Sequence, residues 1–457
     1  MSKNNLREIL PPTTRNFEHR MGDLERRTDT IEKRLAHIEA RLAYEAPLAA
    51  SNTEYALFAA LEALRDNKDR PPRILLAGWY GAQNLGDELM MQTVLERLPE
   101  ELLTHTTVLL WNDPDYPLGK IDPRVKVLHY PPTTAGIQAL AELFDVLIWG
   151  GGAIIDDKQY DLDPRNYSTG NLFIHLSKRM LAQNKQTYCI ALSSNDSLSD
   201  DCYKAELASL VAGAHYFSVR DPYSKETLAK AGIDVSPVVI DNDIAFASEQ
   251  LRDLSAQNAM HTSNVRPETI GLVLHCFAEL EAFNYQLLCD TAALAQEHAV
   301  NAGATRILLI PFYNEDQSDT SYLKELAKRF IAEHPNTPAP VVAPYEEDLA
   351  RSPLLDCDLL VSCRYHASLI AGCLRIPFVA ICNDTHAHYP NKTRYLLEQL
   401  FPSDRADQAF LCVKEYTKEG LAQNFVLAQK RSIEKQTVRE LTAATIANLE
   451  RTLASIA

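Results

Sequence analysis

The chain has 457 residues and a mass of 51.2 kDa, which is too long for one ordinary hydrophobic core and indicates two or more domains. Its 61 acidic residues against 45 Lys and Arg give a net charge of −16. This balance argues against a nucleic-acid-binding protein, because such proteins use basic residues to release phosphate counterions. Apolar residues make up 46% of the chain and charged residues 23%, as in a soluble globular protein.

Cysteine use and the N-terminal residues indicate a cytoplasmic location. The nine cysteines form no CxxC pair and no regular framework, which fits a reducing compartment. Residues 1–20 lack the apolar stretch of a signal peptide. We therefore expect a soluble cytoplasmic protein, with peripheral contact to a membrane if its substrate is lipid-linked.

The first segment carries a heptad pattern. Its members alternate in spacings of four and three residues, with mostly charged residues between them: Phe17, Met21, Leu24, Thr28, Ile31, Leu35, Ile38 and Leu42. This narrow stripe predicts a coiled-coil oligomerisation helix within residues 1–50, and hence a homo-oligomer, either dimer or trimer. An amphipathic helix packed on the chain's own globular part is the alternative. Residues 51–72 are expected to form a helical linker that ends at Pro71 and Pro72.

From residue 73 the pattern changes to short apolar runs that alternate with helical stretches, which is typical of buried parallel strands. The first set of runs lies at 74–79, 106–111, 125–130, 145–150, 187–192, 215–220 and 235–240. The second set lies at 269–275, 306–312, 340–345, 358–363 and 377–382. These sets predict an α/β fold with two Rossmann-like domains, 73–248 and 269–414, joined by a polar linker, 249–268. Helices are expected over 415–457, and a ligand beyond the carboxyl ends of the strands.

Six of the 16 glycines fall in two short strings. The first contains Gly78, Gly81 and Gly86, and runs from a predicted strand into a predicted helix, where backbone can approach an anion closely. Asn84, Asp87 and Glu88 in this string are candidates for binding sugar hydroxyls. Alternatively, Asn84 forms a turn and the two acidic residues cap the helix.

The second string is Gly150, Gly151 and Gly152, at a predicted strand end. Three adjacent glycines leave backbone N–H groups available to bind a phosphate, and a bend at the strand end is the alternative.

Two further segments carry candidate catalytic side chains. Arg364 and His366 share a strand-to-helix corner, where arginine offers a planar fork for a carboxylate or phosphate and histidine can transfer protons near neutral pH. Cys363 beside them fits inert packing better than a nucleophile. Arg220 precedes another helix and either reaches the ligand cleft or pairs with an acidic residue. Asp243 follows the last strand of the first half, where a carboxylate would face the cleft.

Five segments, in the order in which they occur along the chain, resemble the polysaccharide pyruvyl transferase family. They are GWYGAQNLGDELM, LIWGGGAIIDD, SVRDPYSKETLAKAGI, DIAFA and DLLVSCRYHASLIAGCLRIPFVAI. The resemblance covers about residues 73–400 and excludes the heptad segment. It implies a glycosyltransferase-B-like fold. The implied reaction moves pyruvate from phosphoenolpyruvate, the donor substrate, onto two hydroxyls of a saccharide acceptor in surface polysaccharide biosynthesis. It leaves a ketal and releases phosphate, with no metal or other cofactor.

The resemblance also implies roles for particular residues. Arg364 would hold the carboxylate or phosphate of the donor, His366 would act as general acid or base, and Asp243 would help protonate the donor's methylene carbon or activate a hydroxyl. The expected substrate-binding residues are Gly81, Asn84, Gly86, Asp87, Gly150, Gly151, Gly152, Arg220, His386 and Lys392.

The chain departs from the family pattern at two places. His386 stands where the family usually has a lysine, twenty residues after the signature histidine, and Lys392 six residues further on is its candidate substitute. Ser193, Ser194 and Asn195 replace the usual glycine-proline loop. A glycosyltransferase that uses a nucleotide sugar is therefore an alternative function. A non-catalytic partner that assembles other enzymes through the coiled coil is another.

Overall fold

A computed structural model describes most of the chain after residue 69. The described residues are 70–111, 121–130, 134–161, 168–194, 197–257, 267–299, 305–314, 318–384, 388–401, 410–430 and 433–456. They all belong to one compact unit, which spans Asp66–Tyr130 and Thr134–Ala457. The predicted coiled coil and nearly all of the predicted helical linker lie outside the described residues.

The first half of this unit is built on a seven-stranded parallel sheet with the strand order β3-β2-β1-β4-β5-β6-β7. Its strands are β1 (Ile74–Ala77), β2 (Thr106–Leu110), β3 (Lys126–His129), β4 (Val146–Ile155), β5 (Gln186–Ser194), β6 (Tyr216–Val219) and β7 (Val239–Ile240). Most of these strands are buried apolar runs, as expected when helices cover both faces of a parallel sheet.

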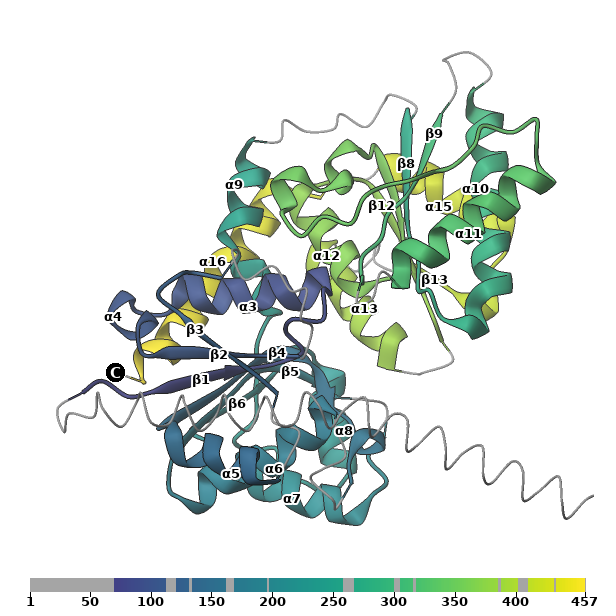
Figure 1. The fold of residues 1–457 in the computed structure, drawn as a ribbon. Coiled ribbons are helices and arrows are strands. Elements are labelled where there is room, and N and C mark those ends of the chain that lie inside the picture. The colour runs from purple at the N-terminus through teal and green to yellow at the C-terminus, as the bar shows by residue number, and fades with distance from the viewer. Residues whose placement is uncertain are drawn as a thin grey trace, which may run out of the picture. The chain divides into compact units, whose positions relative to one another are not determined.

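Helices connect the strands of this sheet, and Figure 1 shows α3 on one face and α5, α6 and α7 on the other. They are α3 (Leu85–Arg97), α4 (Glu100–Leu103), α5 (Thr134–Leu143), α6 (Thr169–Ala182), α7 (Asp201–Gly213), α8 (Pro222–Lys230) and α9 (Glu249–Gln257), with the short 3-10 helices η2 (Asp157–Gln159) and η3 (Ile244–Ala247).

The second half is built on a six-stranded parallel sheet with the order β10-β9-β8-β11-β12-β13. Its strands are β8 (Thr269–Val273), β9 (Arg306–Leu309), β10 (Val341–Val342), β11 (Leu359–Ser362), β12 (Phe378–Cys382) and β13 (Phe410–Cys412). Its helices are α10 (Glu281–Ala299), α11 (Ser318–Glu333), α12 (Tyr365–Leu374), α13 (His388–Leu400), α15 (Lys418–Lys430) and α16 (Lys435–Ala454), with η4 (Ala278–Leu280), η6 (Leu349–Arg351), η7 (Pro353–Asp356) and η9 (Val413–Glu415).

The two sheets share one topology. In each sheet, the first three strands along the chain run from the centre to one edge, and the next strand then pairs with the other side of the first strand. The strand order therefore reverses between β1 and β4 in the first sheet, and between β8 and β11 in the second. In open parallel sheets ligands bind beyond the carboxyl ends of the strands at such a reversal point.

The predicted strands are present, with three differences. The runs at 235–240 and 340–345 pair over only two residues each, β7 and β10, because Pro237, Pro340 and Pro344 cannot donate to a strand ladder. The glycines Gly150–Gly152 lie inside β4, which continues to Ile155, and not at a strand end. The half-buried edge strand β13 is absent from the predicted set, because three residues beside a polar stretch carry little periodicity.

Part of the segment predicted as an interdomain linker is helical. Helix α9 begins at Glu249, and Leu251 on it is buried while Leu254 packs against the core. Two apolar side chains three residues apart on an otherwise polar helix are enough to fix it on the surface of the unit.

A single cluster of buried apolar side chains joins the two halves. It includes Leu89 on α3, Phe246 on η3, Ile310 after β9, Ile370 on α12 and Leu453 on α16. The C-terminal helix α16 contributes because it follows the second sheet but packs against η3 and α3 of the first half (Figure 1). The Nδ2 atom of Asn242, before η3, donates to Oγ1 of Thr445 on α16 at 3.1 Å.

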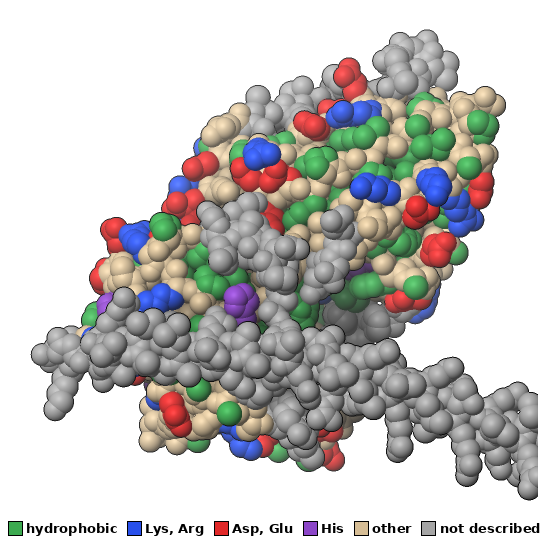
Figure 2. All heavy atoms as spheres, viewed as in Figure 1, with side chains coloured by type: hydrophobic (Ala, Val, Ile, Leu, Met, Phe, Trp, Pro, Cys, Tyr) green, Lys and Arg blue, Asp and Glu red, His purple; other side chains and the backbone are tan. Residues whose placement is uncertain are grey.

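The surface and the helices add two observations. On the face drawn in Figure 2, acidic and basic side chains are interspersed, with no single basic patch, in agreement with the acidic composition. Among the described residues, no helix has both the length and the apolar character that crossing a bilayer requires.

Candidate active site

The candidate site residues follow the carboxyl ends of their strands. Gly86 and Asp87 follow β1, Arg220 follows β6, and Asp243 follows β7, all in the first half. His366 follows β11, which lies at the reversal point of the second sheet. The fold therefore brings residues from distant parts of the sequence to the same edge of their sheets.

His366, Arg220 and Asp243 form a buried cluster. Nη1 of Arg220 donates to Oδ2 of Asp243 at 2.7 Å, with side chains that are 3% and 0% exposed. Nε2 of His366 lies 3.4 Å from that same Oδ2 and 3.4 Å from Nη1 of Arg220. Asp243 is itself held in place, because its Oδ1 accepts from the backbone N–H of Ala245 at the start of η3.

This arrangement accommodates both protonation states of His366. A neutral Nε2 can accept from the Arg220 guanidinium, whereas a protonated Nε2 can donate to the Asp243 carboxylate. Both distances exceed those of a good hydrogen bond, so either contact can be replaced by a substrate hydroxyl at little cost. The cluster therefore has the geometry of a general acid–base group with a fixed partner.

The electrostatics of the pair keep both partners charged. Burial alone would raise the pKa of Asp243, but His366 and Arg220 outweigh it and hold that pKa below its usual range. Burial likewise would lower the pKa of Arg220, and the Asp243 carboxylate more than offsets this effect. Asp243 is thus a permanent carboxylate near neutral pH, suited to stabilising a protonated His366.

Gly86 and Asp87 lie directly beside the histidine. A Cβ atom on Gly86 would be only 2.1 Å from Nδ1 of His366, so only glycine permits this close approach of α3 to the ring. The neighbouring Asp87 is 8% exposed, and burial raises the pKa of its carboxyl to about 6 against the lowering effects of His366 and Arg220. Asp87 can therefore hold a proton close to neutral pH.

Lys392 adds a buried cation from α13. Its Nζ lies 4.2 Å from the ring of Tyr389 and 5.8 Å from that of Tyr365, and the residue is 6% exposed. Within the described ranges no carboxylate comes within ion-pair distance of this ammonium. Burial, reinforced by Arg220, lowers the pKa of Lys392 to about 7. Asp221 and Asp87 oppose this lowering from a longer distance, and a bound anion would add a closer countercharge.

Arg364 is anchored within the second half. Its Nη2 lies 2.9 Å from both carboxylate oxygens of Asp319, and its Nε donates to the carbonyl of Leu274 at 3.1 Å. Asp319 also accepts from the backbone N–H groups of Phe312 and Tyr313. Part of the predicted ligand-binding fork of Arg364 is thus already engaged, and its partner Asp319 holds the loop after β9.

The first glycine string serves mainly to shape the loop before α3. Gly81 has φ +81° and its N–H donates to Oε1 of Glu88 at 2.8 Å. Asn84 precedes α3 and its backbone pairs with Tyr313 in an isolated antiparallel bridge. This loop therefore contacts the second half through backbone, and neither Gly81 nor Asn84 is in the buried cluster.

The second string is likewise part of the packing. The carbonyl of Gly150 accepts from the Tyr80 hydroxyl at 2.6 Å. Gly151 and Gly152 have φ values of +91° and +97°, which explains glycine at both positions. A Cβ on Gly151 would contact Met90 at 2.7 Å, and one on Gly152 would lie 3.5 Å from Oδ1 of Asp87. Of the three, Gly152 is adjacent to the candidate site.

Sequence reasoning missed His275, which follows β8 at the other side of the reversal point. Burial, together with Arg364 and Lys392, holds the pKa of His275 well below its usual range, so the ring is neutral at physiological pH. The available signal was its position at the end of the predicted strand 269–275, beside the strand that leads to His366. Asp319, the partner of Arg364, lies in a helix and gave no such signal.

Two observations complete the account of the predicted residues. His386 lies outside the described residues, so its predicted role stays a prediction. Among the side chains that the structure describes, no three or more His, Cys, Asp or Glu residues gather as metal ligands would.

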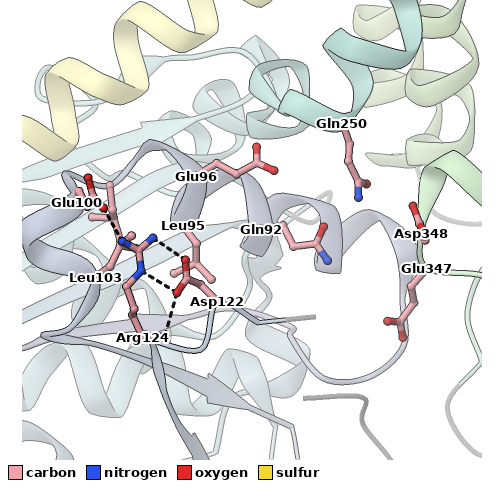
Figure 3. Close-up of a pocket in the computed structure, with 11 residues that line it drawn as sticks. Gln92, Leu95, Glu96, Glu100, Leu103, Asp122, Arg124, Gln250, Glu347 and Asp348 are labelled. Atoms are coloured by element: carbon pink, nitrogen blue, oxygen red, sulfur yellow. Dashed lines mark hydrogen bonds and ion pairs between the residues drawn. The ribbon is translucent and has the colours of Figure 1, made fainter. Parts of the chain in front are cut away.

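A separate hollow of about 690 Å³ lies along the C-terminal part of α3 (Figure 3). It shares no residue with the buried cluster, and its lining is Gln92, Leu95, Glu96, Leu98, Glu100, Leu103, Asp122, Arg124, Gln250, Glu347 and Asp348. Its single guanidinium, on Arg124, is already paired with Asp122 at 2.7 Å. An excess of carboxylates makes this hollow unsuitable for an anionic substrate.

The fold is that of glycosyltransferase-B-like enzymes. Sucrose-phosphate synthase from Thermosynechococcus elongatus superposes with a TM-score of 0.52 and 12% identity, over 84% of this chain and 98% of that one. UDP-GlcNAc 2-epimerase from Neisseria meningitidis superposes with a TM-score of 0.51 and 11% identity, over 83% and 99% of the two chains. Identities this low show a common fold only.

The family follows from the sequence itself. The model of the polysaccharide pyruvyl transferase family matches residues 84–385, about two thirds of the 457 residues. The chain therefore belongs to the polysaccharide pyruvyl transferase family, as the resemblance of its five segments predicted. No curated protein matches its sequence.

Proposed function

We propose that this protein transfers pyruvate from phosphoenolpyruvate to two hydroxyls of a saccharide during polysaccharide biosynthesis, forming a cyclic ketal and releasing phosphate. The observation that carries the proposal is the position of His366 Nε2, 3.4 Å from both a guanidinium and a carboxylate. Family membership supplies the reaction class, and the chemistry of the remaining residues supports the donor.

Donor binding is assigned to the cations around the cluster. Phosphoenolpyruvate carries a carboxylate and a phosphate, and needs cationic partners for both. Lys392 is buried without a carboxylate at ion-pair distance among the described residues, and Arg220 lies next to His366. Arg364 contributes less directly, because Asp319 already neutralises it. This assignment gives Lys392 the role of the lysine that the family usually has twenty residues after the signature histidine, where this chain has His386.

Asp87 is the proposed acid for the first step. The methylene carbon of the donor gains a proton, and the adjacent carbon becomes electron-poor enough to be attacked by a hydroxyl oxygen. A carboxyl with a pKa of about 6 is a better proton source than Asp243, whose pKa is held low. We therefore assign carbon protonation to Asp87 and give Asp243 the task of positioning and stabilising His366.

His366 is the proposed base for the hydroxyl. The first acceptor hydroxyl loses its proton to Nε2 as its oxygen bonds to the donor carbon, and Asp243 stabilises the resulting imidazolium. The carbon–oxygen bond to phosphate then breaks, the second hydroxyl adds to the same carbon, and the ketal closes. Overall the two hydroxyl protons are balanced by one on the new methyl group and one on the phosphate.

The experiment is transfer to a panel of saccharides in the presence of phosphoenolpyruvate, followed by acceptor mass and released phosphate. An acceptor heavier by one pyruvate less one water, with one phosphate released per transfer, supports the proposal. His366→Ala should lower turnover by about 10²–10⁴-fold with the midpoint of unfolding retained. Wild-type turnover in that variant contradicts the role of His366. Phosphate release that does not depend on any saccharide contradicts pyruvyl transfer.

A further inference from the structure

One large aromatic side chain is exposed near the carboxyl end of β8, the strand that pairs with β11. Phe277 follows β8 and is 40% exposed. One face of its ring lies against the buried His275, with centroids 5.2 Å apart and planes inclined by 17°. Isolated exposed apolar residues are ordinary, and Ile331 on α11 is 45% exposed. Phe277 differs because it continues a series of rings.

The rings lead from the surface to the catalytic histidine. The ring of His275 lies 5.6 Å from that of Tyr389, and Nζ of Lys392 lies 4.2 Å from the ring of Tyr389 and 5.8 Å from that of Tyr365. Tyr365 in turn lies 5.1 Å from His366. The series, which we call the aromatic row, consists of Phe277, His275 and Tyr389 and, on the other side of the Lys392 ammonium, Tyr365 and His366.

His275 and Phe277 together give the outer end of the row a flat stacked surface. Burial, Arg364 and Lys392 hold the pKa of His275 well below its usual range, so the ring itself carries no charge. His275 is 8% exposed, and its buried Nδ1 atom has no hydrogen-bond partner among the residues that the structure describes. A buried ring nitrogen of this kind is satisfied when a ligand or an ordered water occupies the adjoining space.

We propose that Phe277 is a specificity residue that stacks against a sugar ring of the acceptor. This inference rests on the proposed function, because the row ends at the histidine that takes the hydroxyl proton. A sugar ring has an apolar C–H face that suits a flat, half-exposed aromatic surface, and hydroxyls at its edge that suit the neutral polar atoms nearby. The charges of the donor instead require Arg220 and Lys392, at the inner end of the row.

The test compares Phe277→Ala with Phe277→Tyr, which keeps the flat face, and with Ile331→Ala as a matched exposed control. Phe277→Ala should raise the acceptor KM by about tenfold, because one binding surface is lost equally from ground and transition states, while kcat changes little. Phe277→Tyr and Ile331→Ala should behave as the wild type. The stabilisation by phosphoenolpyruvate alone should be the same in all four proteins.

Two results would overturn the inference. An unchanged acceptor KM in Phe277→Ala means that the ring does not contact the acceptor. A loss of stabilisation by phosphoenolpyruvate in that variant means that the ring supports the donor site or the fold.

Failure of the proposed function gives a different pattern. If the wild type transfers no pyruvate, saccharide binding is measured directly by calorimetry on the wild type and Phe277→Ala. Weaker binding in the variant supports the stacking role. Equal binding, no binding, or weakening only for a nucleotide contradicts it.

Discussion

At the scale of single residues, Gly86 has the clearest consequence. Its Cα lies against the imidazole of His366, and an added Cβ would be 2.1 Å from Nδ1. Gly86→Ala should therefore displace the ring from Arg220 and Asp243 and lower turnover by about 10²-fold or more. Gly213→Ala is the matched control, because its Cβ would meet only the side chain of Leu181, at 3.2 Å. Equal turnover in the two variants would contradict the close contact between α3 and His366.

The proposed role of Lys392 predicts that donor binding depends on pH. Its pKa is lowered to about 7, so its ammonium loses its proton as the pH rises through that value, and the donor loses a cation. The dissociation constant of phosphoenolpyruvate should thus increase between pH 6 and 8.5, by roughly tenfold for each pH unit above the pKa. Lys392→Arg, which stays charged, should remove most of this increase. The same pH dependence in both proteins would exclude Lys392 from the donor site.

At the scale of elements, the loop after β9 is held to the loop before α3. Asp319 on α11 accepts from the N–H groups of Phe312 and Tyr313 and pairs with Arg364. The carbonyl of Phe312 accepts from the N–H of Leu85 at 3.1 Å. This set of contacts links Arg364, which precedes the helix that carries His366, to the helix that carries Asp87.

Asp319→Asn should loosen that link. The amide keeps the shape of the side chain but removes the charge that pairs with Arg364, so the backbone hydrogen bonds of both loops should open more often. Amide hydrogen exchange should be faster at Leu85 and Tyr313, and unchanged at Ile270 in the centre of β8. Unaltered exchange at Leu85 would show that the ion pair does not support this contact.

The elements themselves were largely predictable from the sequence. Continuous apolar runs such as 74–79 and 358–363 identify buried parallel strands because helices cover both faces of the sheet. The edge strand β13 and the helix α9 were not predicted from the sequence, because short or mostly polar elements depend on a few tertiary contacts. The interior position of Gly150–Gly152 in β4 was missed for a related reason. Tyr80, from another strand–helix connection, supplies the packing there.

The sequence predicted which residues form the candidate site better than it predicted what each of them does. Strand-to-helix corners singled out Arg220, Asp243, Arg364 and His366, and the structure places three of these in contact. The ion pair of Arg364 could not be predicted, because Asp319 lies 45 residues away and in a different element. The same holds for His275, whose neutral state depends on burial beside Arg364 and Lys392.

At the scale of the whole molecule, the heptad pattern of residues 17–42 predicts a homo-oligomer. That segment lies outside the described residues, whereas every residue of the buried cluster lies after residue 69. Deleting residues 1–45 should therefore reduce the molar mass in light scattering by an integral factor and preserve most of the turnover. Loss of turnover with an unchanged molar mass would contradict both the oligomerisation role and the independence of the site.

The account as a whole depends on phosphoenolpyruvate being the donor, and thermal unfolding with that ligand alone tests this most directly. At 100 times its dissociation constant, a ligand of the native state adds about 2.7 kcal/mol of stability, which for a protein of this size raises the midpoint by roughly a few degrees. We predict that rise with phosphoenolpyruvate in the absence of any saccharide. A midpoint that does not respond to phosphoenolpyruvate but rises with a nucleotide sugar would contradict the account and indicate glycosyl transfer.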